Sequence, residues 1–145
     1  MNTRFHGVMS ISLIGLATAL AAVAMFRASV ALGIGYLMMS GVAGGAVLYA
    51  FCAKCPCRAR CGHVVPGKIA ALFGREPGPY TPIEYGVLAL FGLVLIGVPQ
   101  VWLWRTPWLL IGYWALAGVG LVQILTFVCR SCSNLHCPVM LARQR

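Results

Sequence analysis

The chain is poor in acidic residues and in charged residues of any kind. Only 9% of its 145 residues are charged, and Glu76 and Glu84 are its only carboxylates. Paired carboxylates for acid–base hydrolysis are therefore absent. Phosphate-binding loops and nucleophile elbows are absent as well. These absences argue against a self-contained hydrolase or nucleotide-dependent enzyme.

Charge is missing altogether from four long apolar runs. The runs cover residues 8–26, 28–51, 85–104 and 107–128. Each can cross about 30 Å of hydrocarbon at about 1.5 Å per residue. We therefore expect an all-α membrane protein, with residues 1–145 forming a single bundle of four transmembrane helices in contact with lipid. A cysteine-rich loop (residues 52–84) and a cysteine-rich tail (residues 129–145) lie outside the spans.

The spans contain little that could perform chemistry within the bilayer. Without charged residues at mid-span, a proton relay or an ion-coupled transporter is disfavoured. No histidine lies in the four runs, which disfavours a haem held between two histidines. Gln123 is the strongest polar group within a span, and it would bond either a neighbouring helix or a quinone carbonyl.

Basic residues are concentrated on one predicted face of the membrane. That face carries nine of them: Arg4, Lys54, Arg58, Arg60, Lys68, Arg75, Arg130, Arg143 and Arg145. Only Arg27 and Arg105 fall on the other face. The positive-inside rule then places both termini and the cysteine-rich loop in the cytoplasm, for a multi-pass protein of the inner membrane. The basic surplus reflects topology and anionic lipid rather than binding of nucleic acid.

Local patterns mark helix ends and contacts. Thr81-Pro82-Ile83-Glu84 predicts a capping box at the start of the third span, and Thr106-Pro107 predicts a similar start for the fourth. The spacing of Gly41 and Gly45 predicts close helix packing within the chain. An alternative reading of residues 1–24 is a cleaved signal peptide, which would leave the cysteines on the same face.

The seven cysteines form two groups, each beginning where an apolar run stops. The groups are Cys52, Cys55, Cys57 and Cys61 after the second span, and Cys129, Cys132 and Cys137 after the fourth. Each contains a C-x-x-C unit at a helix end. Because a reducing cytoplasm disfavours disulfides, clustered cysteines there indicate a metal site. We expect the second and fourth spans to be neighbours, so that the two groups converge on a zinc ion or on iron–sulfur clusters.

Further residues could complete such a site. His63 and His136 lie on the same face, and imidazole is a plausible additional ligand. Seven thiolates and one histidine would supply eight ligands, enough for two 4Fe-4S clusters. The neighbouring Lys54, Arg58, Arg60 and Arg130 would offset the negative charge of the thiolates. A zinc ion that ties the two helix ends together is the structural alternative.

Cys55-Pro56 and Cys137-Pro138 echo the Cys-Pro that closes bacterial ferredoxin motifs. With its four spans, the layout loosely resembles the membrane ferredoxin subunits that accompany periplasmic nitrate and nitrous oxide reductases. Those carry C-x-x-x-C-P motifs after their second and fourth spans. Here the matching segments, Cys52 to Pro56 and Cys132 to Pro138, are one residue short and one residue long. The family's separate cytoplasmic ferredoxin domain has no counterpart in this chain. The resemblance implies electron transfer linked to a membrane quinol.

The sequence therefore favours a non-catalytic subunit that carries electrons between a quinone pool and a partner oxidoreductase. Two alternatives remain open: a zinc-stabilised membrane anchor or assembly protein, and a soft-metal transporter. The transporter is weakened by the lack of a cysteine at mid-span. Thiol–disulfide exchange with quinone is a further option, but it would require cysteines on the outer face.

Overall fold

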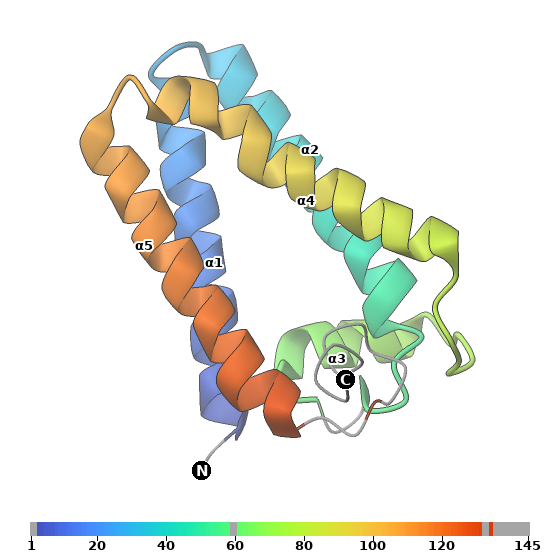
Figure 1. Ribbon diagram of the computed structural model, residues 1–145. Coiled ribbons are helices and arrows are strands. Elements are labelled where there is room, and N and C mark those ends of the chain that lie inside the picture. The colour runs from blue at the N-terminus through green and yellow to red at the C-terminus, as the bar shows by residue number, and fades with distance from the viewer. Residues whose placement is uncertain (1–2, 59–60, 132–133, 135–145) are drawn as a thin grey trace.

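The computed structural model describes residues 3–58, 61–131 and 134, and the elements in this part of the chain are all helical (Figure 1). The α-helices are α1 (Thr3–Phe26), α2 (Val30–Val47), α3 (Val64–Leu72), α4 (Pro82–Leu103) and α5 (Pro107–Gln123). Two π-helical turns, η1 (Leu48–Cys52) and η3 (Ile124–Val128), extend α2 and α5 without a break, and a short 3₁₀ turn, η4 (Cys129–Ser131), follows η3. The all-helical prediction is confirmed at this level.

Four of the helical segments are long and apolar enough to cross a membrane. They are Thr3–Phe26, Val30–Cys52, Pro82–Leu103 and Pro107–Val128. The predicted number of spans is therefore confirmed. The first helix begins at Thr3 rather than at residue 8, so His6 lies inside it. The expectation that histidine is absent from the spans is wrong at this position, because the helix begins several residues before the apolar run does.

The start of α4 shows how local sequence sets an element boundary. The Thr81 hydroxyl accepts a hydrogen bond from the backbone N–H of Glu84, and the Glu84 carboxylate accepts one from the Thr81 N–H at 2.7 Å. Pro82 occupies the first helical position, so the predicted capping box is confirmed. At α5 the proline is in place, but the Thr106 side chain makes no capping hydrogen bond.

The helices pack mainly as α5 along α1, followed by α1 against α2, and α4 makes smaller contacts with both α1 and α2 (Figure 1). Small residues allow the α1–α5 approach: Ala17 and Ala21 are buried on α1, and a side chain at Gly120 would meet the Ser10 carbonyl and Ile14. The expectation that the second and fourth spans are neighbours is wrong for the described residues. Small residues that match across the interface place α5 on α1 instead of α2.

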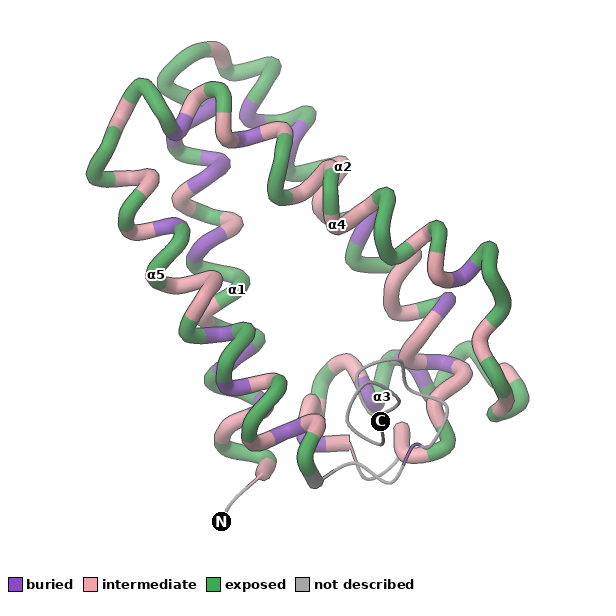
Figure 2. The backbone as a smooth tube through the Cα atoms, viewed as in Figure 1, coloured by how far each residue is buried: buried purple, intermediate pink, exposed green. Residues whose placement is uncertain are grey.

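The glycines of α2 have a different role from the one predicted. A Cβ atom added at Gly41, Gly44 or Gly45 would meet nothing within 4 Å. The Gly41–Gly45 face is therefore open, and the prediction that it packs within the chain is wrong. Figure 2 shows the same pattern more widely, because buried residues follow only a narrow strip of each span.

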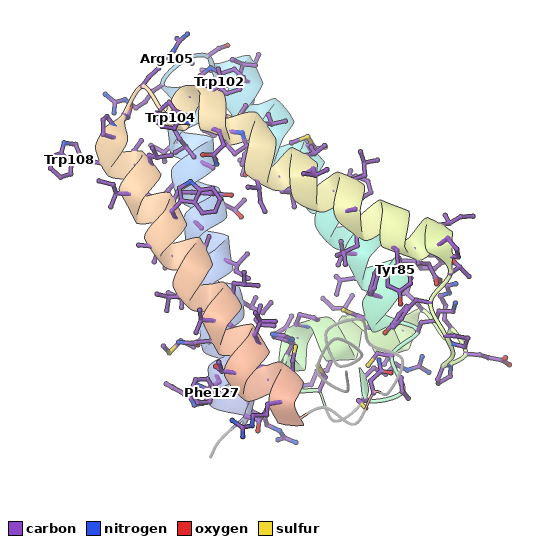
Figure 3. All side chains as sticks on the ribbon, viewed as in Figure 1. Tyr85, Trp102, Trp104, Arg105, Trp108 and Phe127 are labelled. Atoms are coloured by element: carbon purple, nitrogen blue, oxygen red, sulfur yellow. The ribbon has the colours of Figure 1, made fainter. Side chains whose placement is uncertain are left out.

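The start of α1, the cysteine-rich loop and the end of η3 meet at one end of the bundle. Gly7 of α1 lies so close to Gly62 that any side chain would collide with the Gly62 carbonyl, and Gly62 is itself close to Thr3 and Val128. Trp104, Arg105 and Trp108 lie at the opposite end from Tyr85 and Phe127 (Figure 3). Aromatic side chains thus occur at both ends of the spans, as expected near membrane interfaces.

Candidate metal centre

The first cysteine group is wound into consecutive turns directly after α2. Cys52 is the last residue of η1, and the Cys55 N–H donates to the Cys52 carbonyl at 3.2 Å. The same three-residue step repeats from Arg58 to Cys55 and from Cys61 to Arg58. This winding brings Cys52, Cys55 and Cys61 to one cavity of about 160 Å³, which His63 also lines.

The rest of the cavity wall is mostly apolar and comes from four parts of the chain. It consists of Phe51, Arg58, Pro66, Gly67, Tyr80 and Asn134. The Tyr80 ring stacks on Phe51 with centroids 4.7 Å apart, and the Tyr80 hydroxyl donates to the Phe51 carbonyl at 3.3 Å. These apolar contacts cover the thiols on one side. Such surroundings favour the binding of a soft metal by thiolates.

Burial sets the protonation of two candidate ligands. Desolvation is the largest influence on Cys55 and raises the pKa of its thiol. Desolvation also lowers the pKa of His63, so its imidazole is neutral at physiological pH. A neutral imidazole is the form that binds metals, whereas the Cys55 thiol would release a proton when a metal binds.

Asn134 connects the second cysteine group to the first. This residue lies between Cys132 and Cys137 in the sequence and is only 2% exposed. Its Nδ2 lies 3.5 Å from the Cys55 sulfur and donates to the Tyr80 hydroxyl at 3.1 Å. The tail after the fourth span therefore reaches the cavity at this residue. The sequence analysis missed Asn134, and its position between two cysteines was the available signal.

The basic residues near the cavity have specific partners. Lys54, which lies between Cys52 and Cys55 in the sequence, forms an ion pair with Glu84 at 2.9 Å. Arg75 holds the other Glu84 oxygen at 3.1 Å. Arg58 lines the cavity and donates to the carbonyls of Ala53 and Arg75. Both acceptors are neutral carbonyls, so neither of them offsets the positive charge of Arg58 beside the cysteines.

The other predicted ligands are placed differently or lie outside the described residues. Cys57 and Cys129 are described and partly exposed, but neither lines this cavity. Cys132, Cys137 and His136 lie outside the described residues. Within the described part of the chain, no three Cys, His, Asp or Glu side chains are arranged to hold a metal ion. The thiol and imidazole groups that line the cavity are ligands that suit a soft metal. A complete set of ligands around one metal position is not seen among the described residues.

Gln123, the predicted quinone ligand, is 9% exposed and lies on α5 one turn beyond Gly120. Its Oε1 atom is buried and has no hydrogen-bond partner in the described residues, and the same is true of His6 Nδ1 on α1. The His6 ring stacks on Phe127 of η3, with centroids 4.2 Å apart. Buried polar groups thus line the α1–η3 contact near the cysteine end.

Both cysteine groups begin at a π-helical turn. η1 ends at Cys52, and η3 ends one residue before Cys129. Single π turns inside α-helices occur frequently at functional sites. The repeat was visible in the sequence as two hairpins that each end in cysteines, but nothing in the residue pattern indicated the π geometry.

No protein-family model, curated protein or solved structure is similar enough to the chain to match it.

Proposed function

We propose that this protein is a small membrane subunit that holds iron–sulfur clusters, of the 4Fe-4S type, at the cytoplasmic end of its four spans. In this role it passes electrons between the membrane quinone pool and a partner oxidoreductase, and it has no catalytic site of its own. Such clusters take up and release one electron at a time. The cluster ligands would come from both cysteine groups.

The observation that carries this proposal is the contact between Asn134 and Cys55. Asn134 belongs to the tail, and its side chain is buried in the cavity formed by the first group. A tail that carries thiols therefore approaches a cavity that already contains Cys52, Cys55, Cys61 and His63. The donor number and softness of this combined set suit iron–sulfur ligation.

Two further features support a redox role. Among the described residues Arg58 forms no ion pair, and its positive charge at the cavity would favour the more negative, reduced form of a thiolate-ligated cluster. The Asn134 amide donates toward the Cys55 sulfur, and hydrogen bonds to cluster sulfurs raise reduction potentials.

A zinc ion that only fastens the cysteine-rich loop to the helices is less needed in this fold. The loop is already fastened by Lys54 and Arg75 to Glu84, by Arg58 to two carbonyls, and by the close approach of Gly62 to α1. These contacts hold the end of α2 near α4 without any metal. The zinc anchor remains the outcome that the experiment below must exclude.

The decisive experiment is anaerobic purification followed by elemental and spectroscopic analysis. We expect iron and acid-labile sulfide with little zinc, a brown colour, and a paramagnetic signal that appears on reduction. Cys55→Ser and Cys132→Ser should each lose a cluster, because each removes a thiolate from a C-x-x-C unit. Val65→Ser, on an exposed part of α3, is the matched control and should keep full iron content.

Asn134→Leu tests the contact between Asn134 and the Cys55 sulfur separately. It should keep most of the iron but lower the reduction potential, because one hydrogen bond to a ligand sulfur is lost. A colourless preparation with one zinc per chain, unchanged by reduction, would overturn the electron-transfer proposal and favour the anchoring role.

A further inference from the structure

A second cavity, of about 290 Å³, lies among the four membrane spans. All four spans contribute to its wall, which includes Ala17 from α1, Tyr36 from α2, Gly92 and Leu95 from α4, and Tyr113 and Trp114 from α5. It is separate from the cavity lined by the cysteines. An apolar cavity of about 150 Å³ is enough to bind benzene. This one has room for a substituted six-membered ring.

Two phenols are the main polar groups in this apolar wall, and only one is engaged. Pro99 has no N–H, so the Leu95 carbonyl four residues earlier lacks its helical partner. The Tyr36 hydroxyl donates to that carbonyl at 3.2 Å. Tyr113 is 5% exposed and lines the cavity, and no hydrogen bond of its hydroxyl is seen among the described residues. A ligand that offers an acceptor from within the cavity would therefore gain a hydrogen bond that the wall itself does not supply.

We propose that this cavity binds the ring of a membrane quinone, with Tyr113 donating a hydrogen bond to a ring carbonyl. The occupant must be dissolved in the bilayer, because the wall consists of transmembrane helices. It must offer an acceptor to Tyr113 and a flat ring of the size described above. A lipid acyl chain meets the first requirement but would leave the Tyr113 hydroxyl unsatisfied. Electron exchange with the bound quinone rests on the proposed function, whereas quinone binding itself does not.

Binding can be measured with a short-chain quinone in purified protein freed of native quinone. Trp114 lines the cavity and is held by a hydrogen bond from its Nε1 to Gln100 at 3.2 Å, so quinone binding should quench its fluorescence. The probe is a ubiquinone analogue with a decyl tail, and decylbenzene serves as the ring without carbonyls. We expect saturable quenching by the quinone, at least tenfold stronger binding than decylbenzene, and displacement of the quinone only at high decylbenzene concentration.

Two pairs of variants locate the site. Tyr113→Phe should weaken quinone binding about tenfold, the loss of one hydrogen bond. Tyr85→Phe removes a phenol outside the cavity and should change nothing. Gly92→Phe should abolish binding by filling the cavity, because a Cβ at Gly92 meets nothing within 4 Å. Gly97→Phe, on the same helix and equally open, does not line the cavity and should bind normally.

Equal affinity for decylbenzene and the quinone, or no effect of either Tyr113→Phe or Gly92→Phe, would overturn the proposal. The measurement needs no iron, so the two proposals fail separately. Quinone binding in a protein that holds only zinc would sustain this site and remove the electron-transfer function. A protein with iron–sulfur clusters but no saturable quinone binding would do the reverse.

Discussion

At the scale of single residues, Pro99 and Tyr36 illustrate how a membrane helix tolerates a missing donor. The bilayer offers no water to satisfy the carbonyl that a proline releases. Here the Tyr36 hydroxyl of α2 supplies the donor from a neighbouring span. The contact also joins α2 to α4, two helices that pack against each other. One side chain therefore repairs the backbone and fixes a helix pair.

This pairing predicts a coupled effect on stability. Tyr36→Phe should lower the free energy of unfolding by about 1–2 kcal/mol, since the Leu95 carbonyl is left without a donor. In a Pro99→Ala background the restored N–H can reach that carbonyl, so the same substitution should cost much less. Unfolding of the four proteins by SDS titration in detergent micelles would give the coupling energy. An identical cost in both backgrounds would show that the hydroxyl does not compensate for the proline.

At the scale of elements, the anchorage of α4 on the cysteine loop depends on one carboxylate. Glu84 closes the capping box with Thr81 and also pairs with Lys54 and Arg75. Glu84 is 7% exposed, so its carboxylate is largely withdrawn from water, whereas Lys54 and Arg75 are only partly buried. Lys54 lies inside the first C-x-x-C unit, and the start of the third span is thereby tied to the candidate metal centre.

Glu84→Gln should therefore do more than remove a surface charge. We expect a loss of about 2 kcal/mol or more, because the cap weakens and two partly buried cations lose their partner. Glu76→Gln is the matched control: it changes the net charge equally at an exposed position with no ion pair in the described residues. Thermal unfolding in micelles, with metal content measured in parallel, compares the two. Equal effects would mean that only net charge matters.

The elements also show which features a sequence can reveal. The four spans and the Thr81 cap follow from local composition and spacing, so they could be predicted. The choice of neighbours could not, because α5 fits α1 through small residues such as Ala17, Ala21 and Gly120 that are common in all spans. Gly41 and Gly45 carry the better-known motif and face open space. At the candidate site, the cysteines could be predicted because their residue type and spacing are typical of metal ligands. Asn134 and the cavity wall could not, because they come from segments that only the tertiary fold brings together.

At the scale of the whole molecule, α1 is the central helix. It contacts α2, α3, α4, α5 and η3, and it is the most deeply buried of the four spans. Its alanines supply much of the buried core, including Ala17, Ala21 and Ala22. The signal-peptide reading of residues 1–24 would remove these contacts.

The predicted orientation can be tested on intact cells. A membrane-impermeant maleimide should fail to label the native cysteines until the cells are permeabilised, since the basic end of the bundle is expected to face the cytoplasm. An Arg105→Cys variant, at the opposite end, should be labelled from outside and provides the positive control. Labelling of Cys57 in intact cells would reverse the topology. It would also return disulfide chemistry as the leading interpretation of the cysteines.

The π-helical turns at the ends of α2 and α5 carry a consequence for how this chain can change. A π turn holds one residue more than an α turn, so each half of the chain carries a surplus residue just before its thiols. Losing that residue would let the turn close into an ordinary α turn, so the residues beyond it would keep their direction around the helix axis. Losing a residue from the regular part of α2 or α5 would instead rotate everything beyond it by about 100° and turn the thiols that follow away from their present direction. A single-residue deletion inside η1 or η3 should therefore disturb the cysteines less than the same deletion one or two turns earlier.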